Sequence, residues 1–494
     1  MWTKVLVWLA ALAAVVLGSV AVESSPARAH DAILVLTTDD EMAIDGDCSL
    51  REAIRAANTN LSYDFCSAGV ASGDPDVIVL LEGTYTLSIA GTGEDGNLTG
   101  DLDVMSDAQF IGPGNGGAVI NANGIDRVLD VHSGSVQVIG IGIQGGAISG
   151  AGAGIRAASP LSVENVVISG NTASAAGGGI ASDAFLTMVT TTVTGNSGSL
   201  GGGIANTGSA SIENSTLSGN TAGISGGGLY NCGTATLMND TVSGNTADVQ
   251  GGGIYEGCDI LTLTNVSIAS NEASEGATAG AGGLFVDAQS GGSATVKNTI
   301  ISGNTGVNCL GDDGITSLGH NLEEGPTLDE ATLCGFDAAG DVVQGAMTLA
   351  PLAANNGITQ THALLEGSPA VDGAADDCPP PTGDQRSLLR PIDGDNDGEA
   401  RCDIGAFESD PLGVGVTATP SGTATTPSAT TPTPTAPGTP EPTNGPSATV
   451  DATGLPVTGS EGGSGSWRVP VAVMALAAAG ACGIALGVQR RRKS

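Results

Sequence analysis

Carboxylates at alternate positions near residue 393 could bind a cation. The candidate oxygen donors are Asp393, Asp395, Asp397, Glu399 and Asp403. Aspartates at positions 1, 3 and 5 followed by a glycine at position 6 form the first half of a calcium-binding loop. Position 12, where such a loop has glutamate, is occupied by Ile404. The sequence therefore leaves two alternatives open, a calcium site and a solvated acidic turn.

Three aromatic residues recur at intervals of one sequence repeat and could bind a sugar. Tyr230, Tyr255 and Phe285 each follow an aliphatic residue of a recurring segment. We expect them to stack as a ladder on the outer surface, where aromatic rings can receive sugar rings. The alternative is that the stacking only stabilises consecutive coils.

Chemistry on a glycan would need a denser set of side chains. Lyases of acidic sugars need cations beside the substrate carboxylate, but between residues 130 and 310 the only Lys or Arg residues are Arg156 and Lys297. Hydrolysis needs two carboxylates on one face, and Asp240, Glu256 and Asp259 are the nearest approach, which we interpret as solvated acidic surface. The sequence predicts no catalytic residues; a polysaccharide lyase or glycoside hydrolase is the alternative.

The composition restricts both the partners and the fold. The 52 acidic and 15 basic residues give a net charge of -37, which argues against nucleic-acid partners and other polyanions. With 78 glycines and only 3% aromatic residues, the chain cannot build a bulky globular core. We expect a thin, repetitive core.

A repeat of about 25 residues, evident from residue 160 onward, must position the candidate groups. Each unit has an asparagine that follows glycine in all but one case, and most units then have three glycines before an aliphatic residue. These asparagines are Asn171, Asn196, Asn220, Asn245, Asn271 and Asn304. A constant period indicates stacked coils.

The pattern within each unit predicts short strands. Leu161 and Val163 alternate with Ser162 and Glu164, which is the period of two that places apolar side chains on one face of a strand. Two further aliphatic columns predict a second and a third strand. We therefore expect an all-β fold, a right-handed parallel β-helix with three strands per coil, over residues 76–310.

Two asparagine columns are expected to stabilise the corners of the coils. The first contains the six asparagines named above. The second contains Asn165, Asn214, Asn239, Asn265 and Asn298, with Thr190 in the remaining repeat. Asparagine tolerates left-handed backbone angles, and its amide can both donate to and accept from the next asparagine in the stack.

Nine cysteines favour an oxidising, extracellular compartment. Eight of them form sequential couples that we expect to be disulfides, namely Cys48–Cys66, Cys232–Cys258, Cys309–Cys334 and Cys378–Cys402. Sequence alone does not prove this connectivity, because eight cysteines allow about 105 pairings.

Both ends of the chain predict export and anchoring. Residues 1–29 have the basic residue, apolar run and small-residue cleavage site of a signal peptide. Near the C-terminus, the motif formed by Leu455, Pro456, Val457, Thr458 and Gly459 precedes an apolar segment at 469–488 and a basic tail.

This order resembles the LPxTG cell-wall sorting signal at residues 455–494. The resemblance implies that a sortase cleaves between Thr458 and Gly459 and transfers the protein to peptidoglycan. The alternative is that residues 469–488 remain as a single transmembrane anchor with the N-terminal part outside the cell. Residues 411–454, rich in Thr and Pro, predict a disordered stalk.

Residues 30–75 contain a predicted capping helix. Ser49 and Glu52 have the spacing of a capping box, and Leu50, Ala53 and Ile54 share one face. The segment Cys48-Ser49-Leu50-Arg51-Glu52-Ala53 resembles the CSLREA family. The resemblance implies parallel β-helix repeats in an exported bacterial protein, and it implies no catalytic residues.

Residues 311–410 resemble the choice-of-anchor module, which implies a C-terminal cap followed by an anchoring device. The matching segments include Asp384-Gln385-Arg386 and Asp403-Ile404-Gly405-Ala406, with departures at Asn356 and Ser387. Together these features predict a non-catalytic surface protein for adhesion or contact with an extracellular glycan or a host or neighbouring cell. A purely structural surface role is a further alternative.

Overall fold

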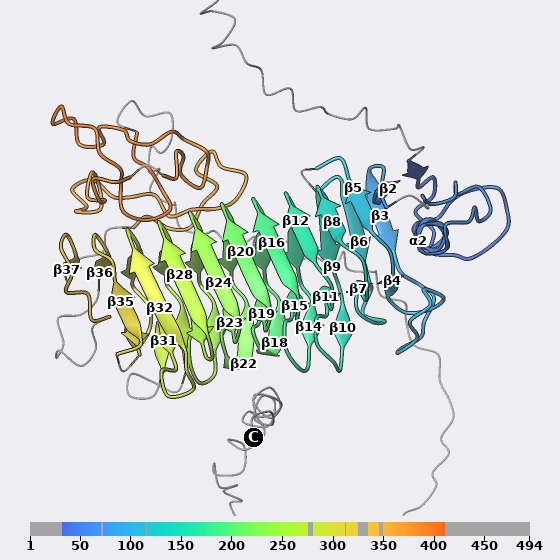
Figure 1. The fold of residues 1–494 in the computed structure, drawn as a ribbon, viewed down its shortest axis with the longest axis horizontal. Helices are drawn as coiled ribbons and strands as arrows, with labels where there is room; N and C mark the ends of the chain where they lie inside the picture. Colours follow the sequence, from blue (N-terminus) through green and yellow to red (C-terminus); the bar gives the residue numbers. More distant parts are fainter. Residues whose placement is uncertain are drawn as a thin grey trace, which may run out of the picture. The chain divides into compact units, whose positions relative to one another are not determined.

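The computed structural model describes residues 32–410, except for residues 71, 72, 115, 275–279, 312, 325–333, 345–348 and 379. Within this region the chain coils into a parallel β-solenoid (Figure 1), as the repeat predicts. Four sheets run along the stack, and we number them in the order in which the chain visits them within a coil.

Sheets 1 and 2 each have 11 strands. Sheet 1 contains β1 (Ile33–Leu34), β2 (Asp76–Val79), β5 (Ala108–Ile111), β8 (Val136–Ile139), β12 (Leu161–Glu164), β16 (Phe185–Val189), β20 (Ser209–Glu213), β24 (Thr234–Met238), β28 (Ile260–Thr264), β32 (Ser293–Lys297) and β35 (Ile315–Ser317). Sheet 2 contains β3 (Gly83–Thr86), β6 (Ala118–Asn121), β9 (Ile141–Gln144), β13 (Val167–Ser169), β17 (Thr192–Thr194), β21 (Thr216–Ser218), β25 (Thr241–Ser243), β29 (Ser267–Ala269), β33 (Ile300–Ser302), β36 (Leu322–Glu324) and β37 (Val342–Gln344).

Sheet 3 has six short strands and sheet 4 has nine. Sheet 3 contains β10 (Ala147–Ile148), β14 (Thr172–Ala173), β18 (Ser197–Leu200), β22 (Thr221–Ser225), β26 (Thr246–Ala247) and β30 (Glu272–Ala273). Sheet 4 contains β4 (Leu102–Val104), β7 (Leu129–Val131), β11 (Ile155–Ala157), β15 (Ile180–Ser182), β19 (Ile204–Asn206), β23 (Leu229–Asn231), β27 (Ile254–Glu256), β31 (Ala281–Val286) and β34 (Val307–Leu310). Sheet 3 was not expected, because strands as short as two residues show no alternation in the sequence.

Asparagine and glycine hold the coils together at their corners. The side-chain oxygen of Asn196 accepts from both the backbone N–H and the side-chain amide of Asn171, each at 3.0 Å, and the pattern continues along the stack to Asn304. The second asparagine column has the expected left-handed backbone angles, such as φ 54° at Asn214. The glycine runs permit close approach, since a Cβ on Gly227 would lie 2.2 Å from the carbonyl oxygen of Gly252.

The N-terminal helix α2 (Leu50–Thr59) has the predicted capping box between Ser49 and Glu52. It lies beside the first strands β2 and β4 (Figure 1). Its apolar residues are buried as expected, but Arg51 is buried as well, with 0% of its surface exposed.

The four disulfides join the sequential cysteine couples that the spacing suggested. They are Cys48–Cys66, Cys232–Cys258, Cys309–Cys334 and Cys378–Cys402. The first fastens the segment before α2 to the segment after it, and the second links neighbouring coils after β23 and β27.

The C-terminal part differs from the end cap that the sequence suggested. Strands β35, β36 and β37 extend the stack past residue 310, and residues 349–408 pack against the side of sheet 2 (Figure 1). Gln385 donates to Thr216 at 2.9 Å, and the Ser243 hydroxyl lies 2.8 Å from His362 Nε2. Because the module covers this side, every residue of the three-residue strands β21, β25, β29 and β33 is buried. Strand β13 is partly exposed. The polar outer column of sheet 2 provides the hydrogen-bond partners that hold this module.

Candidate functional face

One outward-facing column of sheet 4 brings together aromatic and charged residues. One residue from each strand pairs in register with its counterpart one coil away. In order these residues are Asp103, Asp130, Arg156, Ala181, Ala205, Tyr230, Tyr255, Phe285 and Leu310. The column thus runs from charged residues, across two alanines, to three aromatic residues and a leucine.

The aromatic end is the ladder predicted from the sequence. Tyr230 and Tyr255 stack with ring centroids 5.1 Å apart, and Tyr255 and Phe285 stack at 5.4 Å, with interplanar angles of 3° and 5°. Centroid distances of this size fall in the range of stacked aromatic pairs. All three side chains are partly exposed, so the ladder reaches the surface.

The charged end is a network of arginines and aspartates. Arg127 Nη1 lies 2.7 Å from Asp101 Oδ2 and 2.5 Å from Asp130 Oδ2. Arg156 Nη1 approaches the other oxygen of Asp130 at 3.3 Å. Asp103 and Asp130 are almost fully buried, at 1% and 5% exposure. Burial raises the pKa of Asp101 to about 7 and also raises the pKa of Asp103.

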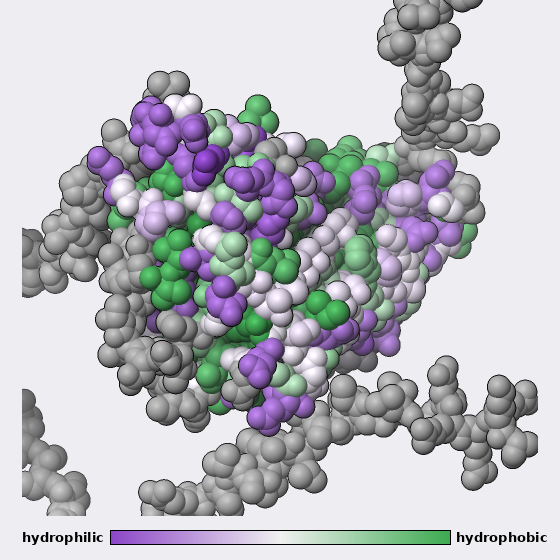
Figure 2. Space-filling model, turned by 60° about the vertical axis from the view of Figure 1, so that its left-hand side comes forward, coloured by the Kyte–Doolittle hydropathy of each residue, from purple (hydrophilic) through white to green (hydrophobic). Residues whose placement is uncertain are grey.

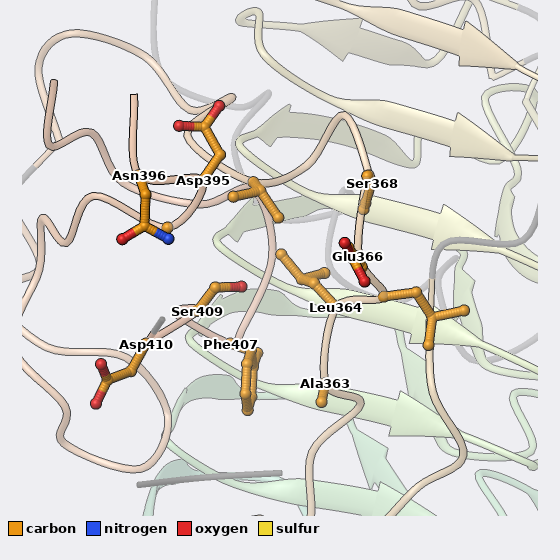
Figure 3. A pocket seen from close by; sticks show the side chains of 13 residues that line it. Ala363, Leu364, Glu366, Ser368, Asp395, Asn396, Phe407, Ser409 and Asp410 are labelled. Atoms are coloured by element: carbon orange, nitrogen blue, oxygen red, sulfur yellow. The ribbon is translucent and has the colours of Figure 1, made fainter. Parts of the chain in front are cut away.

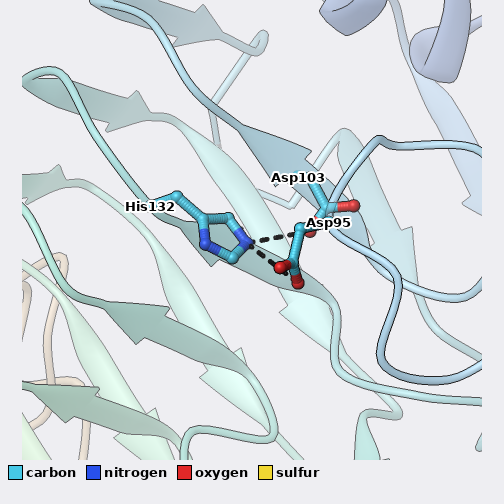
Figure 4. A group of neighbouring side chains, drawn as sticks. All are labelled: Asp95, Asp103 and His132. Atoms are coloured by element: carbon cyan, nitrogen blue, oxygen red, sulfur yellow. Dashed lines mark hydrogen bonds and ion pairs between the residues drawn. The ribbon is translucent and has the colours of Figure 1, made fainter.

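His132 joins this network directly after β7. Its Nε2 atom lies 3.1 Å from Asp103 Oδ1 and 3.9 Å from Asp95 Oδ1, and the three side chains converge in Figure 4. Asp130 Oδ2 is 3.6 Å from the same nitrogen. The side chain of His132 is 21% exposed and that of Asp95 is 72% exposed, so the cluster reaches solvent on this side.

This cluster was not predicted from the sequence. Between residues 130 and 310 the only cations are Arg156 and Lys297, but Arg127, just before that range, contacts Asp130 together with Arg156. The sequence does contain a signal for this cluster: Leu-Asp-Val occurs at 102–104 and again at 129–131, so that its aspartates stack one coil apart. In these coils no Gly-Asn pair directly follows the strand of sheet 2, where the later repeats have it.

The carboxylates interpreted as solvated surface are partly interior. Asp240 and Glu256 are both 0% exposed. Asp240 accepts the backbone N–H of Ser215 at 2.7 Å and of Met238 at 2.8 Å, and Glu256 accepts from the Asn231 side chain. Burial raises the pKa of Glu256 to about 7. Their geometry corresponds to a structural role inside the turns of the coil.

Hydrogen bonds within the turn account for part of the aspartate and glycine pattern of the candidate calcium loop. The two oxygens of Asp393 accept backbone N–H groups of Asp397 and Gly398 within the turn. Carboxylate oxygens of Asp393, Asp395 and Asp372 lie within 4.8 Å of one another, and Asp372 was not foreseen. Of the other candidates, Asp397 donates its backbone N–H to Asp395, and Glu399 pairs with Arg401 at 3.1 Å. Asp403 is buried, and its Oδ1 accepts the backbone N–H of Asp372 at 2.8 Å.

A cavity of about 600 Å³ lies beside this loop in the C-terminal module. Figure 3 shows Asp395 and Asn396 on one side and Leu364, Phe407 and Ser409 on the other. Its lining residues include Glu366, Asp395 and Asp410 but neither lysine nor arginine. The cavity is therefore unsuited to an anionic sugar.

Several predicted features lie outside the described residues. They are the signal peptide at 1–29, the stalk at 411–454, the sorting signal with Leu455, Pro456, Thr458 and Gly459, and the apolar segment at 469–488. Within the described part of 32–410, none of the helices has the length and apolar character needed to cross a membrane.

Comparisons with known proteins identify no family for this chain. No protein-family model matches it, and no curated protein matches it in sequence. Similar solved structures include a pectate lyase, Pel9A, at 12% identity and a TM-score of 0.36, covering 77% of this chain and 96% of the other.

Two further solved structures are similar at the same level. They are the pectin methylesterase PemA from Erwinia chrysanthemi (12% identity, TM-score 0.31, 61% of this chain and 92% of the other) and the A-module of the mannuronan C-5 epimerase AlgE4 from Azotobacter vinelandii (17%, 0.29, 62% and 94%). These scores are too low to assign an activity, so the solenoid assignment rests on the sheet topology itself.

Proposed function

We propose that this chain is a non-catalytic, extracellular β-solenoid that binds a glycan along the outer column of sheet 4. The observation that carries the proposal is the stack of Tyr230, Tyr255 and Phe285 on three consecutive coils. The chain has few aromatic residues, with 3 Trp, 4 Tyr and 6 Phe, yet places three of them on consecutive coils of one outer column. The three rings are partly exposed, and exposed aromatic rings can receive the apolar faces of sugar rings.

The charge of the chain favours a neutral glycan. With a net charge of -37, the protein repels polyanions at long range. In addition, the face drawn in Figure 2 shows hydrophobic patches interrupted by hydrophilic and weakly polar residues. Hydrophobic residues interspersed with polar ones are ordinary on a protein surface, so this view gives no sign of a large apolar protein interface.

Binding to a panel of neutral and acidic polysaccharides tests this function. We expect Phe285→Leu to weaken binding about three- to tenfold, because it removes an aromatic face worth about 0.5–1.5 kcal/mol while keeping an apolar side chain. Thr236→Ala, an exposed change on sheet 1, is the matched control. Equal binding by the wild type and Phe285→Leu would mean that the ladder only stabilises the coils.

A glycan-active enzyme is a second candidate, favoured by the cluster of Asp101, Asp103, Asp130 and His132. Carboxylate oxygens of the three aspartates lie within 4.8 Å of one another, close to the separation of about 5–5.5 Å between the carboxyl groups of retaining glycosidases. However, the three aspartates are at most 5% exposed, so a sugar cannot reach them without a rearrangement. Reducing-sugar and unsaturated-product assays on the bound polysaccharides would detect turnover, and binding without turnover supports our first proposal.

Attachment to the cell wall is part of the proposed function. The motif at 455–459 and the apolar segment at 469–488 support transfer by a sortase to peptidoglycan. Mass spectrometry of wall-released protein should find a C-terminus at Thr458 joined to a peptidoglycan fragment. Recovery of the intact C-terminal tail in the membrane fraction would instead indicate a retained transmembrane anchor.

A further inference from the structure

Three side chains from separate parts of the first coils converge at the charged end of sheet 4. Asp95 comes from the loop between β3 and β4, Asp103 from the middle of β4, and His132 from the residue after β7. Figure 4 shows the imidazole directed toward both carboxylates. The nearest oxygens lie 3.1 Å and 3.9 Å from His132 Nε2.

These distances match the spacing of ligand atoms around a small metal ion. Zinc binds imidazole nitrogen and carboxylate oxygen at ~2.0–2.2 Å, so neighbouring ligand atoms of a tetrahedral site lie ~3.4 Å apart. The two nitrogen-to-oxygen distances bracket this value, and one donor atom from each of the three residues lies within 4.8 Å of the others. Asp130 Oδ2 also lies 3.6 Å from the nitrogen, but it is paired with Arg127 and belongs to the neighbouring trio with Asp101 and Asp103.

The surrounding structure holds the donors in place and leaves one side open. The backbone N–H of Asn97 donates to Asp103 Oδ2 at 2.8 Å, which leaves Oδ1 directed at the imidazole. Arg127 and Arg156 fix Asp130. Hydrogen bonds of this kind orient the ligands of metal sites. The exposure of Asp95 and His132 gives a small ion access that a sugar lacks.

The local charge also favours a cation. Five carboxylates gather here, from Asp95, Asp101, Asp103, Asp126 and Asp130. The guanidinium groups within the network, those of Arg127 and Arg156, balance only two of them. A divalent ion would largely offset the remaining negative charge.

We propose that Asp95, Asp103 and His132 bind a divalent transition-metal ion of the zinc class. Imidazole together with carboxylate is a donor set that suits zinc, whereas calcium requires six to eight oxygen ligands at longer distances. Asp103 belongs to the same column as the aromatic ladder, but the proposed metal binding does not depend on glycan binding.

Zinc titration of the chelator-treated full chain tests the proposal. We expect His132→Ala and Asp95→Asn each to weaken zinc binding by at least about tenfold, because each removes a ligand. Asp95 is exposed, so Asp95→Asn should fold normally. Asp248→Asn, an exposed aspartate near β26, is the matched control and should leave the affinity unchanged.

The imidazole gives a second, residue-specific readout. His320 and His362 have other partners, since His320 Nδ1 contacts the Gly373 oxygen and both nitrogens of His362 are engaged. Zinc should therefore shift the nitrogen NMR signals of His132 and leave those of His320 and His362 in place. Zinc binding that persists unchanged in His132→Ala, or no uptake by the wild type, would overturn the assignment and leave the cluster as an ion pair.

Discussion

Arg51 has the most constrained environment of the charged residues in the N-terminal helix. Its Nε donates to Asp40 at 2.7 Å, and its two terminal nitrogens donate to the carbonyl oxygens of Asp101 and Gly100 at 2.9 and 2.8 Å. The side chain is fully buried. It therefore joins the segment before the helix, the helix itself and the first strand of sheet 4.

Removing this guanidinium should destabilise the fold strongly. We expect Arg51→Met to lower the free energy of unfolding by about 3–5 kcal/mol. Asp40 would lose the cation that pairs with it and keep the backbone N–H groups of Ser88 and Ile89, and two carbonyl oxygens would lose a donor. Urea unfolding followed by circular dichroism would measure the loss. Arg55→Met is the control on the same helix; it removes only a contact with the Tyr63 ring, worth about 0.5–1 kcal/mol.

At the scale of the elements, the asparagine ladder joins one coil to the next. Asn220 accepts from the backbone and side chain of Asn196 and donates to Asn245 and to the Val193 carbonyl, all between 2.9 and 3.0 Å. It is completely buried. Each asparagine thereby satisfies polar groups of its neighbours that water cannot reach.

Breaking one rung should therefore cost more than the loss of a single hydrogen bond. We expect Asn220→Ala to lower the free energy of unfolding by about 1–3 kcal/mol for each polar group left unsatisfied. Thr236→Ala, on the exposed face of sheet 1, should change it by less than about 0.5 kcal/mol. Similar unfolding midpoints for Asn220→Ala and Thr236→Ala would contradict the proposed contribution of the asparagine ladder to stability.

Calcium binding by the acidic loop after residue 392 can be tested through thermal stability. If calcium binds to Asp372, Asp393 and Asp395, it stabilises the folded state by RT ln(1 + c/Kd), which grows with the free calcium concentration c. We expect added calcium to raise the melting temperature of the wild type and to have a smaller effect on Asp395→Asn. Asp95→Asn should retain the full calcium response, and a melting temperature that is indifferent to calcium and chelator would favour the solvated turn.

At the scale of the molecule, buried acids make stability depend on pH. Burial raises the pKa of Asp101, Glu256 and Glu323 to about 7 and that of Glu408 to about 8. A carboxyl whose pKa is higher in the folded than in the unfolded state binds its proton more tightly when folded. Its contribution is complete below the unfolded pKa and is lost as the pH rises through the folded value.

We therefore expect the free energy of unfolding to fall between pH 5 and pH 8. His362 acts in the opposite direction, because burial lowers its pKa and its contribution is lost as the pH falls below about 6.5. Denaturant titrations across this range would show the net slope. Glu323→Gln should flatten it, since the amide does not titrate and keeps an oxygen for the Cys334 N–H.

The sequence by itself determined the repetitive part of this protein. A side chain in a solenoid stacks on its counterpart one coil away, so the period alone places Tyr230 on Tyr255 and Asn196 on Asn220. The capping box at Ser49 is equally local. These features depend on residues at a constant separation along the chain, and the sequence shows that separation directly.

Only the tertiary structure decided where irregular segments meet. The contact of His132 with Asp95 depends on the path of a loop, and the burial of Arg51 depends on a helix packing against strands about 50 residues later. Likewise, Gln385 reaches Thr216 across 169 residues because sheet 2 offers a column of hydroxyl groups along its side. No period relates these pairs, so their distances follow from the folded backbone and from the polar groups that burial must satisfy.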